Sequence, residues 1–205
     1  MTNKTAPRMR QSERRRLSTK KLIRACLELA AEHGMPAITF ESIGQKAGYS
    51  RGLASQKFGS KNGLMEAVIN HLHEQVAEAR AEAQDEQMSG LEALQMFIRI
   101  HLNSLRKTQD NRAYFVLFCA SISEMSDMRE LFAASHERSK NELVQLFHRG
   151  KEDGSVRTDV NAEQGALLIG SQIIGISTQY LADPAIDLDQ IEAEFIDMVA
   201  RSYRA

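Results

Sequence analysis

Residues 39–64 constrain the fold of this 205-residue chain more than any other stretch. Thr39 can cap a helix, and Gly48 stands where that helix must stop and reverse, a position that favours a positive φ. Ser50 can cap a second, short and polar helix, and Ser60 can cap a third. A helix, a glycine-containing turn and a short polar helix predict a helix-turn-helix, whose second helix is shaped for the major groove of DNA.

The charge of the chain is unevenly distributed. Residues 1–61 hold 13 Lys/Arg and 4 Asp/Glu, a net of +9, whereas residues 62–205 hold 13 Lys/Arg and 23 Asp/Glu, a net of −10. The formal net charge of −1 conceals this division. A basic first third joined to an acidic remainder indicates that only one end of the molecule meets a polyanion.

The hydrophobic pattern predicts an all-α fold, because i, i+3, i+4 apolar spacing recurs and strand-like alternation is absent. Residues 1–17 are expected to form a flexible basic arm, followed by a helix-turn-helix domain at 18–62 whose first helix covers 18–33. A larger helical domain follows at 63–205, and the helix from Ser60 connects the two. The basic residues of the arm are Lys4, Arg8, Arg10, Arg14, Arg15 and Arg16.

The larger domain is expected to contain five further helices after a polar join at residues 84–89. Their ranges are 91–106, 113–125, 128–152, 162–181 and 188–203, with a polar break at 107–111. The helix at 113–125 is nearly apolar all round, which predicts a central, buried position.

Several classes of protein are disfavoured. Cys26 and Cys119 lie in apolar contexts, which favours two buried free thiols over a redox pair. The chain shows no secretory signal and no apolar run of membrane-spanning length, so we expect a cytoplasmic protein. His71 and His73 point to different faces of a helix and no zinc spacing occurs, so we expect no metal and no cofactor. No catalytic motif is present, so we expect no enzyme.

The segment 25–68 resembles the DNA-binding domain of the tetracycline-repressor (TetR) family. The matching marks are Gly34, Thr39-x-x-x-Ile43, Ala47-Gly48-Tyr49-Ser50, Gly52, Phe58 and Lys61-x-x-Leu64. The rest of the chain resembles the family in layout alone. The resemblance implies a homodimeric, ligand-responsive transcriptional regulator, most often a repressor, with an effector-binding and dimerisation domain at 63–205.

The family's docking mode implies nine DNA contacts. Base edges would be faced by Arg51, Gly52, Leu53 and Gln56, and phosphates by Thr39, Ser50, Ser55, Lys57 and Lys61. The family usually has an aromatic residue at the position of Ser55 and often His at that of Lys57, so phosphate anchoring is altered here. Arg51 and Lys61 could instead be ordinary solvated charges.

A stripe of small residues on the helix at 162–181 predicts a dimer interface. Its members are Ala166, Gly170, Ser171, Gly175 and Thr178. Glycine within a helix is unfavourable unless close packing compensates, and a symmetric four-helix interface between two copies supplies such packing. Packing against another helix of the same chain is the alternative.

Apolar bulk with a few polar groups predicts a ligand cavity in the second domain. The candidate liners are Phe97, His101, Leu105, Tyr114, Phe118, Cys119, Ile122, Met125, Phe132, His136, Phe147 and Gln172. Each could also be plain core, and His101 and His136 are the best placed to orient a ligand.

Together these features predict a repressor that leaves a palindromic operator when a small, mainly apolar effector binds. Its partners would be double-stranded DNA, a second copy of the chain and that effector. The response could also have the reverse sign. The alternatives are an interaction module of the same fold without specific DNA reading, which Ser55 favours, and an all-α ligand carrier or enzyme.

Overall fold

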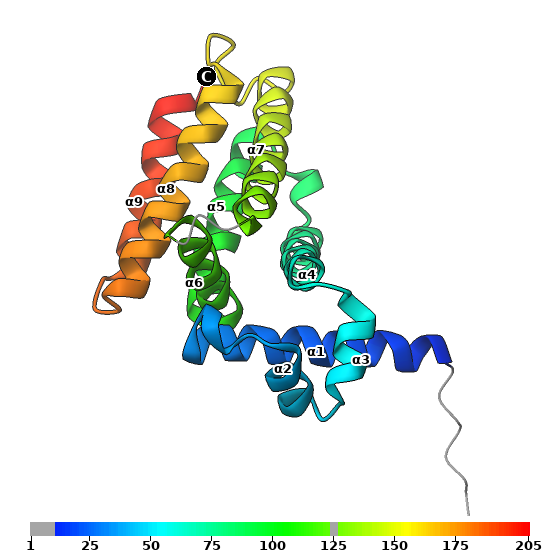
Figure 1. Cartoon of the computed structure of the whole chain (residues 1–205). Helices are drawn as coiled ribbons and strands as arrows, with labels where there is room; N and C mark the ends of the chain where they lie inside the picture. The colour runs from blue at the N-terminus through cyan, green and yellow to red at the C-terminus, as the bar shows by residue number, and fades with distance from the viewer. Residues whose placement is uncertain (1–10, 124–126) are drawn as a thin grey trace, which may run out of the picture.

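The computed structural model describes residues 11–123 and 127–205, and every named secondary-structure element within them is a helix (Figure 1). The α-helices are α1 (Gln11–His33), α2 (Phe40–Ala47), α3 (Arg51–Phe58), α4 (Lys61–Glu82), α5 (Gly90–Lys107), α6 (Gln109–Ser123), α7 (Met128–Glu152), α8 (Ala162–Ala182) and α9 (Leu188–Tyr203). Two short 3-10 turns, η1 (Met35–Ala37) and η2 (Asp85–Gln87), follow α1 and α4. The all-α prediction is confirmed.

Local capping explains where the first short helices begin and end. The Thr39 hydroxyl accepts the Ser42 N–H at 3.0 Å, and the Ser42 hydroxyl accepts the Thr39 N–H at 3.1 Å, which forms a capping box at the start of α2. Gly48 ends α2 with φ 76°, in the left-handed region that favours glycine. Ser50 and Ser60 cap α3 and α4, where their hydroxyls accept the Leu53 and Gly63 N–H groups at 3.2 and 3.1 Å.

The crossing of α2 and α3 depends on Gly44. A Cβ at this position would lie 2.9 Å from the Tyr49 carbonyl oxygen and 3.1 Å from the Arg51 amide nitrogen. Because both neighbours are backbone atoms, any side chain would push α3 away from α2. The absence of a side chain therefore sets how closely the two helices meet.

The core of the N-terminal helices continues into α6 and α7. Leu22, Ile43 and Leu64 are almost fully buried, and they belong to one cluster with Leu117 of α6 and Phe132 of α7. The boundary predicted near residue 62 is therefore not a break in packing, since α1 rests on α6.

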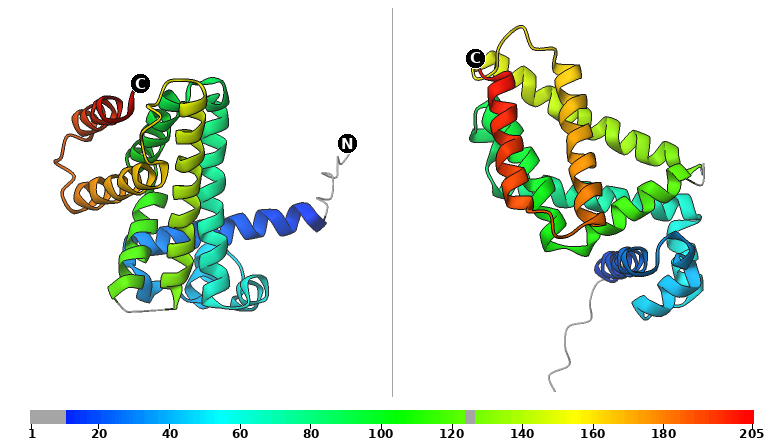
Figure 2. Two further views of the ribbon diagram at one scale, coloured as in Figure 1. Left: turned by 90° about the horizontal axis from the view of Figure 1, so that it is seen from above. Right: turned by 90° about the vertical axis from the view of Figure 1, so that its left-hand side faces the viewer.

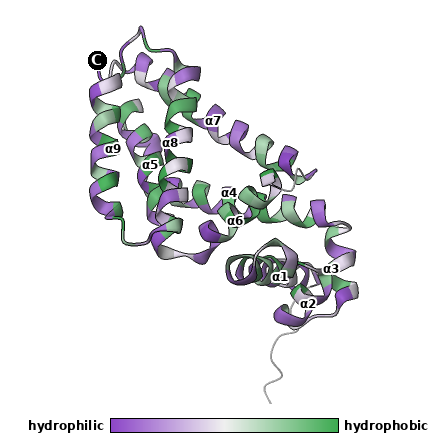
Figure 3. Ribbon diagram, turned by 60° about the vertical axis from the view of Figure 1, so that its left-hand side comes forward, coloured by the Kyte–Doolittle hydropathy of each residue, from purple (hydrophilic) through white to green (hydrophobic). Residues whose placement is uncertain are grey.

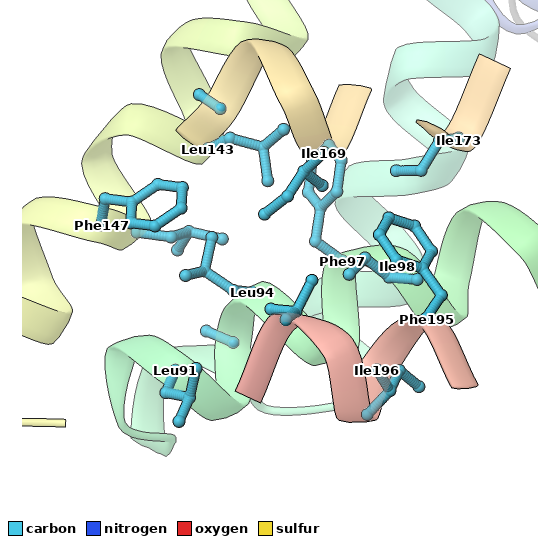
Figure 4. Close-up of a cluster of buried hydrophobic side chains, with 14 of the residues drawn as sticks. Leu91, Leu94, Phe97, Ile98, Leu143, Phe147, Ile169, Ile173, Phe195 and Ile196 are labelled. Carbon is cyan, nitrogen blue, oxygen red and sulfur yellow. The ribbon is translucent and has the colours of Figure 1, made fainter. Parts of the chain in front are cut away.

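A second core fills the space between α5, α7, α8 and α9 (Figure 4). Phe97 of α5, Phe147 of α7, Ile169 of α8 and Phe195 of α9 converge there, each at most 4 % exposed. Figure 2 shows these helices as one body, with the N-terminal end of α1 projecting away from it. Hydrophilic residues dominate the outer sides of α2 and α3 (Figure 3).

Two predicted boundaries were wrong. The helix expected at 18–33 begins at Gln11, so Arg14, Arg15 and Arg16 lie on α1, and the rest of the predicted arm, residues 1–10, lies outside the described residues. The strong helix propensity of Gln, Glu and Arg explains this extension. The break expected at 107–111 is limited to Thr108, because α6 begins at Gln109.

The expected burial of α6 is only partly correct. Cys119 is exposed and Ile122 is 46 % exposed, so this helix has an open side and Cys119 is not a buried thiol. Cys26 is buried as expected, and burial raises the pKa of its thiol to about 12 despite the nearby Lys61.

Every helix of the described residues is too short or too polar to cross a membrane. In the same residues, no group of three or more His, Cys, Asp or Glu side chains is placed to hold a metal ion.

Candidate nucleic-acid interface and ligand cavity

The nine residues predicted to contact DNA lie on or next to α2, α3 and the start of α4. Six of them are exposed: Thr39, Ser50, Arg51, Gly52, Gln56 and Lys61. Leu53, Ser55 and Lys57 are half-buried on α3. Arg51 and Gln56 thus present a guanidinium and an amide to solvent, the groups that pair with guanine and adenine edges in the major groove.

Lys57 has a more specific environment than the sequence indicated. Its Nζ donates to the Arg15 carbonyl oxygen and to the Thr19 Oγ1, both at 2.9 Å. Burial lowers the pKa of Lys57, and the positive charge of Arg15 lowers it further. This ammonium therefore ties α3 to α1.

The N-terminal turns of α1 were missed as ordered elements of this surface. Residues 14–19 of α1 form a groove with Tyr49, Leu53, Gln56 and Lys57. The sequence indicates that Arg14, Arg15 and Arg16 belong to the basic end that meets a polyanion, but only the three-dimensional structure places them beside α3.

A cavity of about 220 Å³ lies between α4, α5, α6, α7 and α8. Four predicted liners surround it: Phe97, His101, Tyr114 and His136. Its other lining residues include His73 on α4 and Ser135 on α7, which were not among the predicted liners. The volume lies below the ~300–1,000 Å³ typical of ligand pockets, so the cavity suits a small molecule.

The remaining predicted liners lie elsewhere. Leu105, Phe132 and Phe147 are buried in the two cores, and Phe118 packs beside Phe132 and His136 without lining the cavity. Gln172 contacts Met198 of α9 through Nε2 and Sδ at 4.0 Å. Cys119 and Ile122 are exposed, and Met125 lies outside the described residues. Helical periodicity places these side chains on a face, but it does not indicate which faces enclose a space.

Burial lowers the pKa of the three histidines that line the cavity. His73 Nε2 lies 2.9 Å from the Ser135 Oγ, and burial lowers the pKa of His73 to about 4. Burial also lowers the pKa of His101, whose Nδ1 lies 2.8 Å from the Phe97 carbonyl oxygen. Burial also lowers the pKa of His136. The Nε2 of this residue is buried without a hydrogen-bond partner among the described residues. An uncharged ligand that accepts or donates a hydrogen bond fits this chemistry.

Lys140 is the one lysine or arginine lining the cavity in the described residues. Its Nζ lies 2.8 Å from a Glu137 carboxylate oxygen and 3.4 Å from a Glu163 oxygen. The hydrogen bond to Glu137 raises the pKa of Lys140, with a further contribution from Glu163. Its charge is therefore already paired.

Helix α4 joins the two sites. Its first residues follow α3, while His73 lines the cavity and bonds to Ser135 of α7. Further along, the Gln75 amide donates to Asp110 of α6 at 3.1 Å. The helix that directly follows α3 therefore also forms a wall of the cavity.

Comparison with known proteins agrees with this arrangement. The sequence profile of bacterial regulatory proteins of the tetR family matches residues 22–68, and that of the BetI-type transcriptional repressor C-terminal domain matches residues 90–202. The HTH-type transcriptional regulator BetI of Escherichia coli strain SMS-3-5 is 32 % identical over 142 residues, which cover 68 % of this chain and 70 % of the relative. The chain belongs to the TetR family.

Other relatives extend this result. BetI of Stenotrophomonas maltophilia strain R551-3 is 29 % identical over 132 residues, 62 % of this chain and 66 % of that protein. Among solved structures, a TetR-family regulator from Rhodococcus sp. superposes with a TM-score of 0.79 at 16 % identity, covering 89 % of this chain and 96 % of that one. FadR, the fatty acid degradation regulator of Bacillus halodurans, gives 0.77 at 15 % identity, with 97 % of each chain covered. These two structures share the fold.

The small-residue stripe of this TetR protein is divided between two environments. Ala166 is fully buried in its own chain, and Gly170 is half-buried beside the cavity. Ser171, Gly175 and Thr178 are exposed. The stripe therefore faces inward at its N-terminal end and outward at its C-terminal end.

The exposed part of α8 includes two large apolar side chains. Leu167 and Leu168 are 60 % and 57 % exposed. A Cβ on Gly170 or Gly175 would meet no atom within 4 Å. Contacts within the chain thus do not explain two glycines in the middle of this helix, where each costs ~1 kcal/mol relative to alanine.

Proposed function

We propose that the protein is a ligand-responsive repressor, released from a two-fold symmetric operator when a small, mainly apolar effector binds. The observation that carries this proposal is the helix-turn-helix, whose α3 presents Arg51 and Gln56 to solvent at the basic end of the chain. The BetI relatives, named as transcriptional regulators, support it.

In this proposal α3 lies in the major groove. Arg51 pairs with a guanine, Gln56 with an adenine, and Leu53 contacts a thymine methyl group, while Gly52 lets the backbone approach. Phosphates are held by Thr39, Ser50, Ser55, Lys57 and Lys61, and the N-termini of α2 and α4 contribute favourable dipoles. Each bidentate base pairing discriminates by ~1–3 kcal/mol.

Two copies joined through α8 and α9 would present two copies of α3 to successive major grooves. The exposed Leu168 and the open space above the exposed Gly175 support this interface. Two-fold symmetry of the protein then requires a palindromic operator.

The effector would bind in the cavity beside α4. Since the described lining is mainly apolar with neutral histidines, we expect an uncharged molecule small enough for about 220 Å³. The protein would have two conformations, one that can span the operator and one that cannot. Release from DNA requires that the effector bind the second conformation more tightly than the first. The His73–Ser135 contact is a direct route by which occupancy would reach α4.

The test is binding of the purified protein to duplexes that tile the DNA beside its own gene, at physiological salt. Preference for one tile over a scrambled duplex, reduced by Arg51→Ala, supports the regulator. Salt-sensitive binding without sequence preference would instead indicate the interaction module. The short Ser55 side chain, in place of an aromatic residue, favours that alternative. No binding to any tile would leave the ligand carrier.

A further inference from the structure

The first turns of α1 and the recognition helix α3 enclose a basic groove, called here the α1–α3 groove. One side is formed by residues 14–19 of α1, and the other by Tyr49, Leu53, Gln56 and Lys57. Figure 1 shows the N-terminal end of α1 running past α3. The groove therefore adjoins the surface that would meet DNA.

Lys57 links the two sides of this groove by hydrogen bonds to two residues of α1. Its Nζ donates to the Arg15 carbonyl oxygen and the Thr19 Oγ1, each at 2.9 Å. The Thr19 hydroxyl in turn donates to the same Arg15 carbonyl at 2.9 Å. Two of the three ammonium protons are thus committed to α1, across 42 and 38 residues of sequence.

The charges of the groove need an anionic partner. Arg15, Arg16 and Lys57 lie together, and Arg15 and Arg16 are exposed. In residues 11–123 and 127–205, neither guanidinium forms an ion pair with a carboxylate. Like charges gathered on one surface repel one another, and a phosphodiester backbone that neutralises them is a favourable partner.

We infer that the α1–α3 groove is a second DNA-backbone site, which binds phosphates through Arg15 and Arg16, and that Lys57 is the positioning residue that fixes it beside the recognition helix. This inference rests on the proposed function, because the duplex bound is the operator. It assigns Lys57 a role through α1 in addition to the single phosphate contact expected from its charge.

The salt dependence of duplex binding separates these two roles. Each phosphate neutralised adds ~0.9 to the slope of log K against log salt concentration. Arg15→Ala/Arg16→Ala should lower the slope by about 2. Lys57→Met removes one charge but releases α1, so it should lower the slope by about 2 to 3, whereas the control Lys61→Ala should lower it by about 1.

Two further variants distinguish loss of charge from loss of position. Adding Arg15→Ala/Arg16→Ala to Lys57→Met should change the slope little, because the arginines are already displaced. Thr19→Val removes a partner of Lys57 and no charge, so any fall in its slope reports position alone.

The tether, meaning the hydrogen bonds from Lys57 to Arg15 and Thr19, can also be measured without DNA. Amide hydrogen exchange at residues 15–19 should be faster in Lys57→Met and unchanged in Lys61→Ala. The inference would be overturned if Lys57→Met lowered the salt slope by only about 1, if this loss added fully to that of the arginine substitutions, and if amide hydrogen exchange at residues 15–19 were unchanged. If the unmodified protein bound no duplex, the proposed function and the phosphate site would both fall, while faster exchange would still establish the tether.

Discussion

At the scale of single residues, the proposed function gives DNA reading and DNA anchoring to different side chains. Arg51 and Lys61 are both exposed and both basic, but they belong to α3 and to the first turn of α4. A guanidinium at a base edge carries sequence information, whereas an ammonium at a phosphate does not. The two residues therefore form a matched pair for substitution.

We predict that Arg51→Ala costs ~1–3 kcal/mol on the operator and relaxes the preference at one base pair. Lys61→Ala should weaken binding to all duplexes equally and lower the salt slope by ~0.9. Fluorescence anisotropy with single-base operator variants measures both effects. Equal losses on specific and scrambled duplexes for Arg51→Ala would contradict its assignment to a base.

The neutral histidine on α4 predicts a pH dependence of folding. Burial lowers the pKa of His73 to about 4 from 6.5, so the unfolded chain binds a proton that the folded chain does not. This contribution to stability is complete above pH 6.5 and is lost as the pH falls towards 4.

His73→Gln should therefore make the free energy of unfolding less dependent on pH between 6.5 and 4, by about 1–2 kcal/mol after allowance for solvent screening. Glutamine keeps a hydrogen-bonding group near Ser135. Denaturant unfolding at pH 7.5, 5.5 and 4.5 provides the measurement. The same pH dependence in both proteins would show that His73 does not carry this effect.

The residues predicted well from sequence are those whose partners are local. The capping roles of Thr39, Ser50 and Ser60 depend on atoms three residues away, and all three were correct. The tether of Lys57 joins atoms 42 residues apart, and no local pattern indicates it.

At the scale of elements, helix packing depends on a few close approaches. Gly90 begins α5, and a Cβ there would overlap the Gly150 backbone of α7. The Gly90 N–H donates to an Asp153 carboxylate oxygen at 2.7 Å, and the Leu91 N–H donates to the Ser155 hydroxyl at 3.1 Å. The start of α5 is thus docked on the end of α7.

We predict that Gly90→Ala lowers the free energy of unfolding by ~1–3 kcal/mol or more, because a backbone segment must move. Gly52→Ala is the control, since its nearest neighbour would be the Ser50 hydroxyl at 3.8 Å. Its stability should change by less than ~1 kcal/mol. Equal stability of the two variants, measured by chemical denaturation, would show that α5 and α7 can separate freely.

Most helices could be predicted because the sequence shows both the apolar periodicity of a helix and the residues that end it. The bounds of α7 match the expected 128–152, and those of α9 match 188–203. The start of α1 was missed because polar, basic segments are also typical of disordered arms. Which side of α6 stays open depends on how α1 lies against it, and that contact is not local.

At the scale of the whole molecule, the apolar face of α8 predicts self-association. Leu168 is 57 % exposed on this face, and Ile122 is 46 % exposed on α6. Leu168→Glu should convert the dimer to a monomer and weaken operator binding, because one copy engages a single half-site. Ile122→Glu adds the same charge at a similarly exposed apolar site, and it should leave both properties unchanged. Sedimentation velocity and duplex titration decide between an α8 interface and one elsewhere.

The cavity marks the limit of prediction at this scale. Phe97, His101, Tyr114 and His136 were named from the sequence and do line it, whereas His73 was assessed only as a metal ligand and set aside. The cavity forms where five helices meet, so its walls depend on the packing of the whole molecule.

The most direct measurement is a hydroxyl-radical footprint of the protein on the duplex that it binds beside its own gene. Two copies of α3 on a symmetric dimer predict two protected patches related by a dyad, with centres ~34–36 Å apart along the duplex. A single protected patch, or protection spread evenly along the DNA, would contradict the dimeric, sequence-reading regulator.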